Sequence, residues 1–160
     1  MIASQLLTEA LPEQSSVEAR LLNADELKPS GWSAFAKLLE PVMQHTADYT
    51  VENVLANVKS GDMQGWAIVD MDREICIGAI ATRLSTFESG LEACTVVAAA
   101  TAKTKLRYAD WRAIIAQIED FARFNDCDIV RIAGRAGWSK ILPEYTTSYV
   151  CIEKCIREKQ

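Results

Sequence analysis

Four basic side chains gather around the start of the best predicted helix in the chain. They are Lys103, Lys105, Arg107 and Arg112. Unpaired N–H groups at a helix start attract phosphate and other anions, and nearby cations add to that attraction. An anion site is one interpretation of this cluster. A solvated basic loop is the other, and the commoner one in a chain with a net charge of −5.

Nucleophilic and metal-binding residues are few. The single histidine is His45, which follows Pro41 and has no serine or cysteine motif to serve. The cysteines, none of them in a Cys-x-x-Cys pair, are Cys76, Cys94, Cys127, Cys151 and Cys155. Their mostly apolar neighbours predict buried, reduced thiols, which suit a reducing cytoplasm. The sequence therefore predicts no metal site, and no hydrolase motif occurs in it.

The composition is that of a globular protein, with 160 residues, 49% of them hydrophobic and 24% charged. The 22 acidic residues exceed the 17 basic ones, which argues against nucleic acid or an anionic membrane as a partner. No window reaches the roughly 18 apolar residues of a membrane helix. The N-terminus carries no recognisable signal peptide.

The first half of the chain predicts a strand followed by two helices. The strand covers Val17–Leu22. Ser30 is a plausible N-cap for the first helix, which Pro41 should end or kink. The second helix is capped by Thr50 and stops at Gly61.

The second half predicts a three-stranded antiparallel meander and a crossover. The meander strands are Trp66–Val69, Glu74–Arg83 and Leu91–Ala100. A helix over Arg107–Asn125 then leads to a strand over Cys127–Ala133. Such a helix-to-strand return predicts a right-handed βαβ crossover.

The predicted fold is α/β, one domain over residues 17–160 with a mixed central sheet. A short helix over Gly134–Leu142 and a last strand over Thr146–Ile156 complete it. Residues 1–16 form a weakly amphipathic tail, too short to hold a helix unaided. Its apolar side chains are the predicted interface residues, Ile2, Leu6, Leu7 and Leu11.

The order of the elements and several short motifs resemble the GNAT acetyltransferase superfamily. Residues 118–123, Ile-Glu-Asp-Phe-Ala-Arg, and the strand that follows are similar to the central helix and next strand of that family. Gly137-Trp138 and Glu153-Lys154 are similar to two later family motifs. The resemblance covers about Val17 to Ile156. It implies a GNAT fold, acetyl-CoA as cofactor, and a tyrosine near the last short helix as general acid, for which Tyr145 and Tyr149 are the candidates beside ordinary packing roles.

The loop that binds the cofactor pyrophosphate in this family reads Gln/Arg-x-x-Gly-x-Gly/Ala and falls on residues 106–111. Leu106 and Trp111 replace its first and last residues, and Asp110 adds a negative charge where phosphates would lie. Trp111 also belongs to the apolar face of its helix, so it should face the core. The departures predict a degenerate loop, no bound cofactor and no catalytic residue. Under the alternative, acetyl-CoA is held by an atypical loop with Lys103, Lys105, Arg107, Tyr108 and Ala109.

Residues 134–145 resemble a Gly-Arg-x-Gly-Trp-x-x-x-Leu stretch of small GNAT-like proteins encoded by tailed bacteriophages. That resemblance implies a non-catalytic virion structural or assembly component that binds protein partners, either further copies of itself in a homo-oligomer or other virion proteins. Its expected location is the host cytoplasm during synthesis and then the virion. The alternatives are an acetyl-CoA-dependent N-acetyltransferase and a binding module for another small ligand.

Overall fold

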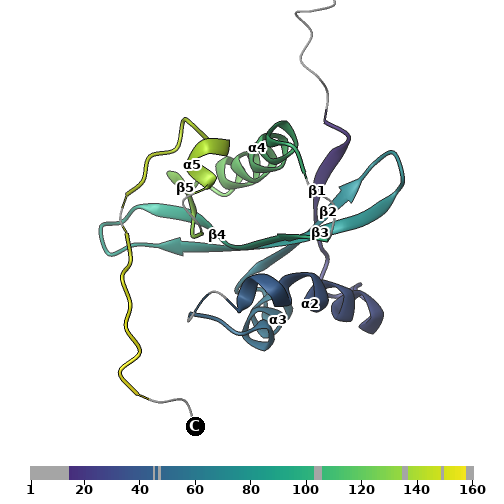
Figure 1. The fold of residues 1–160 in the computed structure, drawn as a ribbon, viewed down its shortest axis with the longest axis horizontal. Coiled ribbons are helices and arrows are strands. Elements are labelled where there is room, and N and C mark those ends of the chain that lie inside the picture. The colour runs from purple at the N-terminus through teal and green to yellow at the C-terminus, as the bar shows by residue number, and fades with distance from the viewer. Residues whose placement is uncertain are drawn as a thin grey trace, which may run out of the picture.

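A five-stranded mixed sheet runs through the centre of the computed structural model (Figure 1). The structure describes residues 15–44, 46, 48–102, 106–134, 137–148 and 150–157. The strands, in their order across the sheet, are β1 (Val17–Leu21), β2 (Gln64–Asp70), β3 (Ile75–Thr86), β4 (Glu92–Thr101) and β5 (Ile129–Ile132). The first four are antiparallel, and β5 runs parallel to β4. The predicted meander and crossover are confirmed.

Two pairs of helices cover the two faces of the sheet (Figure 1). On one face lie α2 (Pro29–Met43) and α3 (Val51–Ser60). On the other lie α4 (Tyr108–Phe124) and the short α5 (Trp138–Ile141). This sandwich of helix, sheet and helix is the predicted α/β architecture.

The start and end predicted for α3 are confirmed. The Thr50 hydroxyl accepts from the backbone N–H of Asn53 (3.1 Å), and the Asn53 side chain accepts from that of Thr50 (3.0 Å). This reciprocal pair satisfies N–H groups that the first helical turn leaves unbonded. At the other end Gly61 adopts φ 88°, a left-handed conformation that costs glycine little.

The expected N-cap of α2 was wrong, and the helix does not end at Pro41. Lys28, not Ser30, is the N-cap, and Pro29 occupies the first turn, where its missing N–H costs nothing. Pro41 lies inside the helix, which continues to Met43. The proline falls in the last turn, so little helix depends on the hydrogen bond that it removes.

Side chains on the two faces of the sheet form two separate cores. We call the first the α4-side core, and its main members are Ile68, Ile80, Val96, Ile114, Ile115 and Ile118. We call the second the α2-side core, and its main members are Phe35, Leu39, Val54, Met63, Ala79 and Ala81. Strand β3 contributes to both, because successive side chains of a strand point to opposite faces.

The predicted last strand is absent: residues 146–148 and 150–156 form no helix or strand. Beyond α5 the chain leaves the domain and runs past the turn between β3 and β4 (Figure 1). Val150, Ile152 and Ile156 are 79%, 92% and 87% exposed. Their alternation is typical of a strand, but a strand also needs a neighbour to bond to, and this segment has none among the described residues.

Several predicted residues lie outside the described part of the chain. They are Ile2, Leu6, Leu7 and Leu11 of the tail, His45, Lys103, Lys105 and Tyr149. The tail interface therefore stays a prediction. In the described ranges, no helix is long and apolar enough to span a membrane, and no cluster of three potential metal-binding side chains occurs.

Candidate functional site

Strand β4 contains an extra residue at Val97. Ala98 pairs with Ala81 of β3 and Val96 pairs with Thr82, so Val97 has no partner on β3. A β-bulge of this kind bends the strand and increases its twist. Residues 98–101 of β4 therefore run in a different direction from the residues before Val97.

Strands β4 and β5 separate directly beside this bulge. Their pairing runs from Ala93 with Ile129 to Val96 with Ile132. One last hydrogen bond joins the Ala133 N–H to the Val96 carbonyl (3.1 Å). Beyond it, no strand among the described residues borders the outer edge of β4.

The backbone of β4 beyond the bulge offers hydrogen-bonding groups on this open side. The Ala102 N–H donates to the carbonyl of Ile77 in β3 (2.7 Å). Antiparallel alternation then directs the N–H and C=O groups of Ala100 and Ala98 to β3, and those of Ala99 and Thr101 the opposite way. An extended molecule that carries amides fits such an edge, because it can bond there as an added strand does.

The carboxylate of Asp110 caps the start of α4. Its Oδ2 accepts from the backbone N–H of Arg107 (3.0 Å), and the Arg107 guanidinium lies 3.3 Å from both carboxylate oxygens. Ser15, just before β1, donates its hydroxyl to Oδ1 (2.9 Å). A negative charge at this position is stabilised by the positive end of the helix. The carboxylate thus occupies the place where the end of α4 would favour a bound anion.

The hydrogen bonds to Asp110 also decide its ionisation. Burial by itself would raise the pKa of this carboxyl, whose side chain is only 8% exposed. The hydrogen bonds from Arg107 and Ser15 outweigh that effect and hold the pKa below its ordinary value. Asp110 therefore stays charged throughout the neutral pH range.

Trp111 faces the protein interior, as its place on the apolar face of the helix predicts. Its ring meets that of Trp138 edge to face, with 5.1 Å between the centroids. Both rings pack against the α4-side core. A large side chain thus stands where the GNAT loop has a small residue, and it serves to hold α5 on α4.

Tyr145 is bound to α4. Its hydroxyl donates to Glu119 Oε2 (2.8 Å), and its ring packs against the α4-side core. Burial raises its pKa, and the hydrogen bond to Glu119 raises it further. Tyr145 therefore stays protonated in neutral solution, and its hydroxyl and ring both hold the chain after α5 against α4.

The cysteines only partly follow the prediction of buried thiols. Cys94 is fully buried in β4, where burial, with a smaller contribution from nearby Cys127, raises its pKa to about 11. The prediction is wrong for Cys76, Cys151 and Cys155, which are exposed. Two of the three lie in the C-terminal segment that forms no strand.

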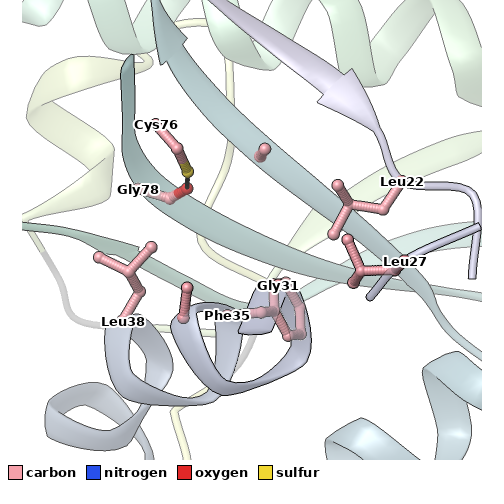
Figure 2. A pocket seen from close by; sticks show the side chains of 9 residues that line it. Leu22, Leu27, Gly31, Phe35, Leu38, Cys76 and Gly78 are labelled. Atoms are coloured by element: carbon pink, nitrogen blue, oxygen red, sulfur yellow. Dashed lines mark hydrogen bonds between the residues drawn. The ribbon is translucent and has the colours of Figure 1, made fainter. Parts of the chain in front are cut away.

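An apolar pocket of about 200 Å³ lies between α2 and the sheet (Figure 2). Leu27, Phe35 and Leu38 line one side of it, and Cys76 and Gly78 of β3 line the other. The Cys76 thiol, the only polar side-chain group of the lining, donates to the Gly78 carbonyl (3.3 Å). Alkyl walls of this kind do not compensate a buried charge. The pocket therefore fits neither a phosphate nor a charged amine.

Of the five residues predicted to bind acetyl-CoA under the alternative, three are described. Arg107, Tyr108 and Ala109 lie together at the start of α4, with Arg107 as its N-cap. The sequence analysis missed the bulge at Val97 and the contact of Ser15 with Asp110. The bulge has no signature beyond a run of small residues, and Ser15 is 95 positions away from Asp110.

Comparison with known proteins identifies the architecture. No protein-family model and no curated protein matches the sequence. Among solved structures, an aminoglycoside acetyltransferase from an uncultured soil metagenomic sample is similar, with a TM-score of 0.65 at 10% identity over 89% of this chain and 97% of that one. A ribosomal-protein-alanine N-acetyltransferase from Brucella melitensis gives 0.60 at 15% identity over 89% and 99%. A GNAT family acetyltransferase from Staphylococcus aureus gives 0.59 at 13% identity over 89% and 100%.

These comparisons overturn the functional hypothesis drawn from the sequence. The non-catalytic virion structural or assembly component is contradicted, because the similar structures are acetyltransferases. The prediction that no cofactor is bound is not supported by these structures either. The α/β prediction is confirmed: the chain has a GNAT fold.

Proposed function

We propose that this protein is an acetyl-CoA-dependent N-acetyltransferase with an atypical loop at the phosphate end of its cofactor site. The observation that carries the proposal is the bulge at Val97 followed by the divergence of β4 from β5. Beyond Val97, the edge of β4 that faced β5 has no neighbouring strand among the described residues, and this open edge lies close in sequence to the start of α4. The fold shared with N-acetyltransferases supports the same conclusion.

The residues present fit one half of acetyl-CoA well. The arm of CoA that ends in the thiol carries amide groups, and the backbone groups of Ala99 and Thr101 on the open side of β4 are suited to bond them. When bound, acetyl-CoA supplies a thioester whose acetyl group passes to an amine nitrogen. The part of β4 after Val97 would hold and orient that arm.

The residues at the start of α4 fit the phosphate end of acetyl-CoA less well, and this is the atypical part of the site. Backbone N–H groups of Tyr108 and Ala109 lie in the first turn of α4, where an anion is favoured. The Asp110 carboxylate opposes a second negative charge there. We infer that Asp110 weakens cofactor binding and that Arg107, which lies against it, partly offsets the repulsion.

The charge of the whole chain favours a cationic acceptor. A net charge of −5 attracts amines, which are protonated in neutral solution. The similar enzymes are named for the acceptors aminoglycosides and a ribosomal-protein alanine. These two classes, with polyamines, are the first to test here. The phage-type lineage implied by residues 134–145 stays a prediction.

The test is a titration of the full chain with acetyl-CoA, followed by transfer to the amine panel. Transfer is best followed by the mass of the acceptor, because the exposed thiols of Cys76, Cys151 and Cys155 would react in an assay for released thiol. A saturable rise of Tm is expected, since a ligand at a hundredfold excess over its Kd stabilises by about 2.7 kcal/mol.

Two variants connect that binding to the site. Ala99→Pro removes the N–H on the open side of β4 and should weaken acetyl-CoA binding at least tenfold, whereas Ala99→Gly keeps the N–H and serves as its control. Asp110→Asn should bind more tightly than the native chain. Absence of binding by both the native chain and Asp110→Asn would refute the proposal, as would binding that Ala99→Pro leaves unchanged.

A further inference from the structure

The apolar pocket between α2 and the sheet continues outward into a wider hollow of about 340 Å³. Ala34, Leu38 and Cys76 line both spaces, whereas Lys37 lines the outer hollow. The inner pocket extends from Cys76 to Leu22 at its far end (Figure 2). The molecule therefore offers an elongated apolar space with a cationic side chain at its mouth.

A bulge in β3 forms the wall of the pocket opposite α2. Ile77 has no partner on β2, because the register shifts between its neighbours Cys76 and Gly78. The Ile77 side chain belongs to the α4-side core, so it does not fill the space below α2. A Cβ at Gly78 would lie 2.6 Å from the Ala100 carbonyl oxygen, which excludes a larger residue there. The wall that β3 contributes is therefore backbone and one thiol.

Lys37 distinguishes the mouth of the pocket from its interior. Its side chain is exposed, and no carboxylate of a described residue lies within ion-pair distance of it. The apolar walls favour an aliphatic chain, whereas the ammonium group attracts an anion. One ammonium group matches a head with one negative charge. A ligand that suits both parts of the site has an aliphatic chain and a single carboxylate.

We propose that this pocket binds a medium-chain aliphatic carboxylate, with its chain between α2 and β3 and its head beside Lys37. A cavity of about 150 Å³ with apolar walls holds a six-carbon ring, so the pocket of about 200 Å³ takes a chain of roughly six to eight carbons. No residue of β4 or of the start of α4 lines it. The inference goes beyond the proposed enzymatic function and does not depend on it.

The first test is a calorimetric titration of the full chain with sodium octanoate at low ionic strength. Octanoate should bind saturably at one site. Hexanoate should bind at least tenfold more weakly, because each CH₂ group removed from an apolar site weakens binding about fourfold. Octylamine keeps the chain and reverses the charge of the head, so it should bind at least threefold more weakly than octanoate.

Alkylation of Cys76 measures occupancy independently. Its thiol is exposed and lines both parts of the site, so saturating octanoate should slow its reaction with iodoacetamide at least tenfold. Cys151 and Cys155 are exposed in the C-terminal segment and line neither space. They serve as internal references whose alkylation rates, followed by peptide mass, should stay unchanged.

Two pairs of variants connect binding to the pocket. Ala34→Phe places a ring in the pocket and should abolish both octanoate binding and the protection of Cys76, whereas Ser33→Phe adds the same ring at an exposed neighbour outside the lining and should preserve both. Lys37→Glu should weaken octanoate binding at least threefold at low ionic strength. Lys140→Glu, on α5 across the sheet, changes the net charge equally and should leave binding unchanged.

Several results would overturn the proposal. They are a native chain that does not bind octanoate saturably, an Ala34→Phe chain that binds it as tightly, and octylamine that binds as tightly as octanoate. A chain starting at Ser15 should bind like the full chain. Binding that appears only in that shorter chain would mean that residues 1–14 are the occupant, which also contradicts the proposal. Acetyl-CoA binding should not change in Ala34→Phe, so the two proposals fail separately.

Discussion

At the scale of single residues, Asp110 explains most about the candidate site. The sequence predicted that its charge would stand where the cofactor phosphates lie in the GNAT family. It did not predict that Arg107 and Ser15 would bind the carboxylate, because Ser15 is distant in sequence and only the fold brings it to α4. A residue that departs from the motif thus has a structural role, which is to cap the helix.

The linkage between Asp110 and pH gives a prediction for stability. The pKa of Asp110 is depressed in the folded state. Its contribution to the free energy of unfolding is therefore fully present above the unfolded-state pKa of about 3.9, and it is lost as the pH falls through the folded-state pKa. Asp110→Asn should lower the free energy of unfolding at pH 7 by roughly 1–3 kcal/mol, the usual cost of losing hydrogen bonds to a charged group. Urea unfolding from pH 7 down to pH 2.5 should show this difference shrinking below pH 4.

A matched control lies on the same helix. Asp120 forms an exposed ion pair with Arg123 (3.0 Å), with its side chain 78% exposed. Asp120→Asn should change stability by less than about 0.5 kcal/mol at pH 7. If the deficit of Asp110→Asn stays constant with pH, the carboxylate is not the group that stabilises this helix start.

At the scale of elements, periodicity and capping residues predicted where most helices and strands lie along the chain. They did not predict how the strands pair. Thr50 and Gly61 bound α3 because caps are local chemistry. The bulge at Val97 depends on how β3 and β4 meet, which no local pattern encodes. The last strand was wrong for a related reason: residues 146–156 have the alternation of a strand, but alternation does not supply a neighbour.

The edge strand β1 is held by a side chain rather than by a further strand. Gln117 of α4 accepts from the Ala19 N–H (2.7 Å) and donates to the Ala19 carbonyl (3.3 Å). Gln117→Ala should therefore lower the free energy of unfolding by about 1–3 kcal/mol, because two hydrogen bonds that contribute roughly 0.5–1.5 kcal/mol each are lost. The amide of Ala19 should exchange faster by at least tenfold.

The comparison variant for this prediction is Arg112→Ala, also on α4. Arg112 is exposed, and alanine is a good helix former, so the free energy of unfolding of this variant should stay within about 0.5 kcal/mol of the native value. An unchanged exchange rate at Ala19 in Gln117→Ala would mean that water replaces the side chain without loss.

At the scale of the whole molecule, one sheet carries both the candidate site and two cores. The start of α4 follows β4 within a few residues of the chain, and residues 106–111 there depart from the GNAT loop motif. Hydrophobic periodicity therefore predicted the scaffold, but the resemblance of residues 134–145 to phage proteins led to a functional hypothesis that the similar structures contradict. Fold and function have separate determinants.

The shared sheet also predicts how the domain unfolds. Ile80 of β3 belongs to the α4-side core, while its neighbours Ala79 and Ala81 belong to the α2-side core. Neither core can lose its strands without exposing the other, so both should unfold in one cooperative transition. Ile118→Ala and Leu39→Ala, one fully buried side chain from each core, should each lower the free energy of unfolding by about 2–5 kcal/mol.

The tryptophans report on the two sides separately. Trp32 packs against the α2-side core, and Trp111 and Trp138 pack against the α4-side core. In a chain labelled with fluorotryptophan, the fluorine resonances of both groups should lose their native positions at the same urea concentration. Each alanine variant should shift that common midpoint, whichever core it lies in. Two midpoints, with Leu39→Ala moving only the resonance of Trp32, would show that the sheet does not couple its two faces.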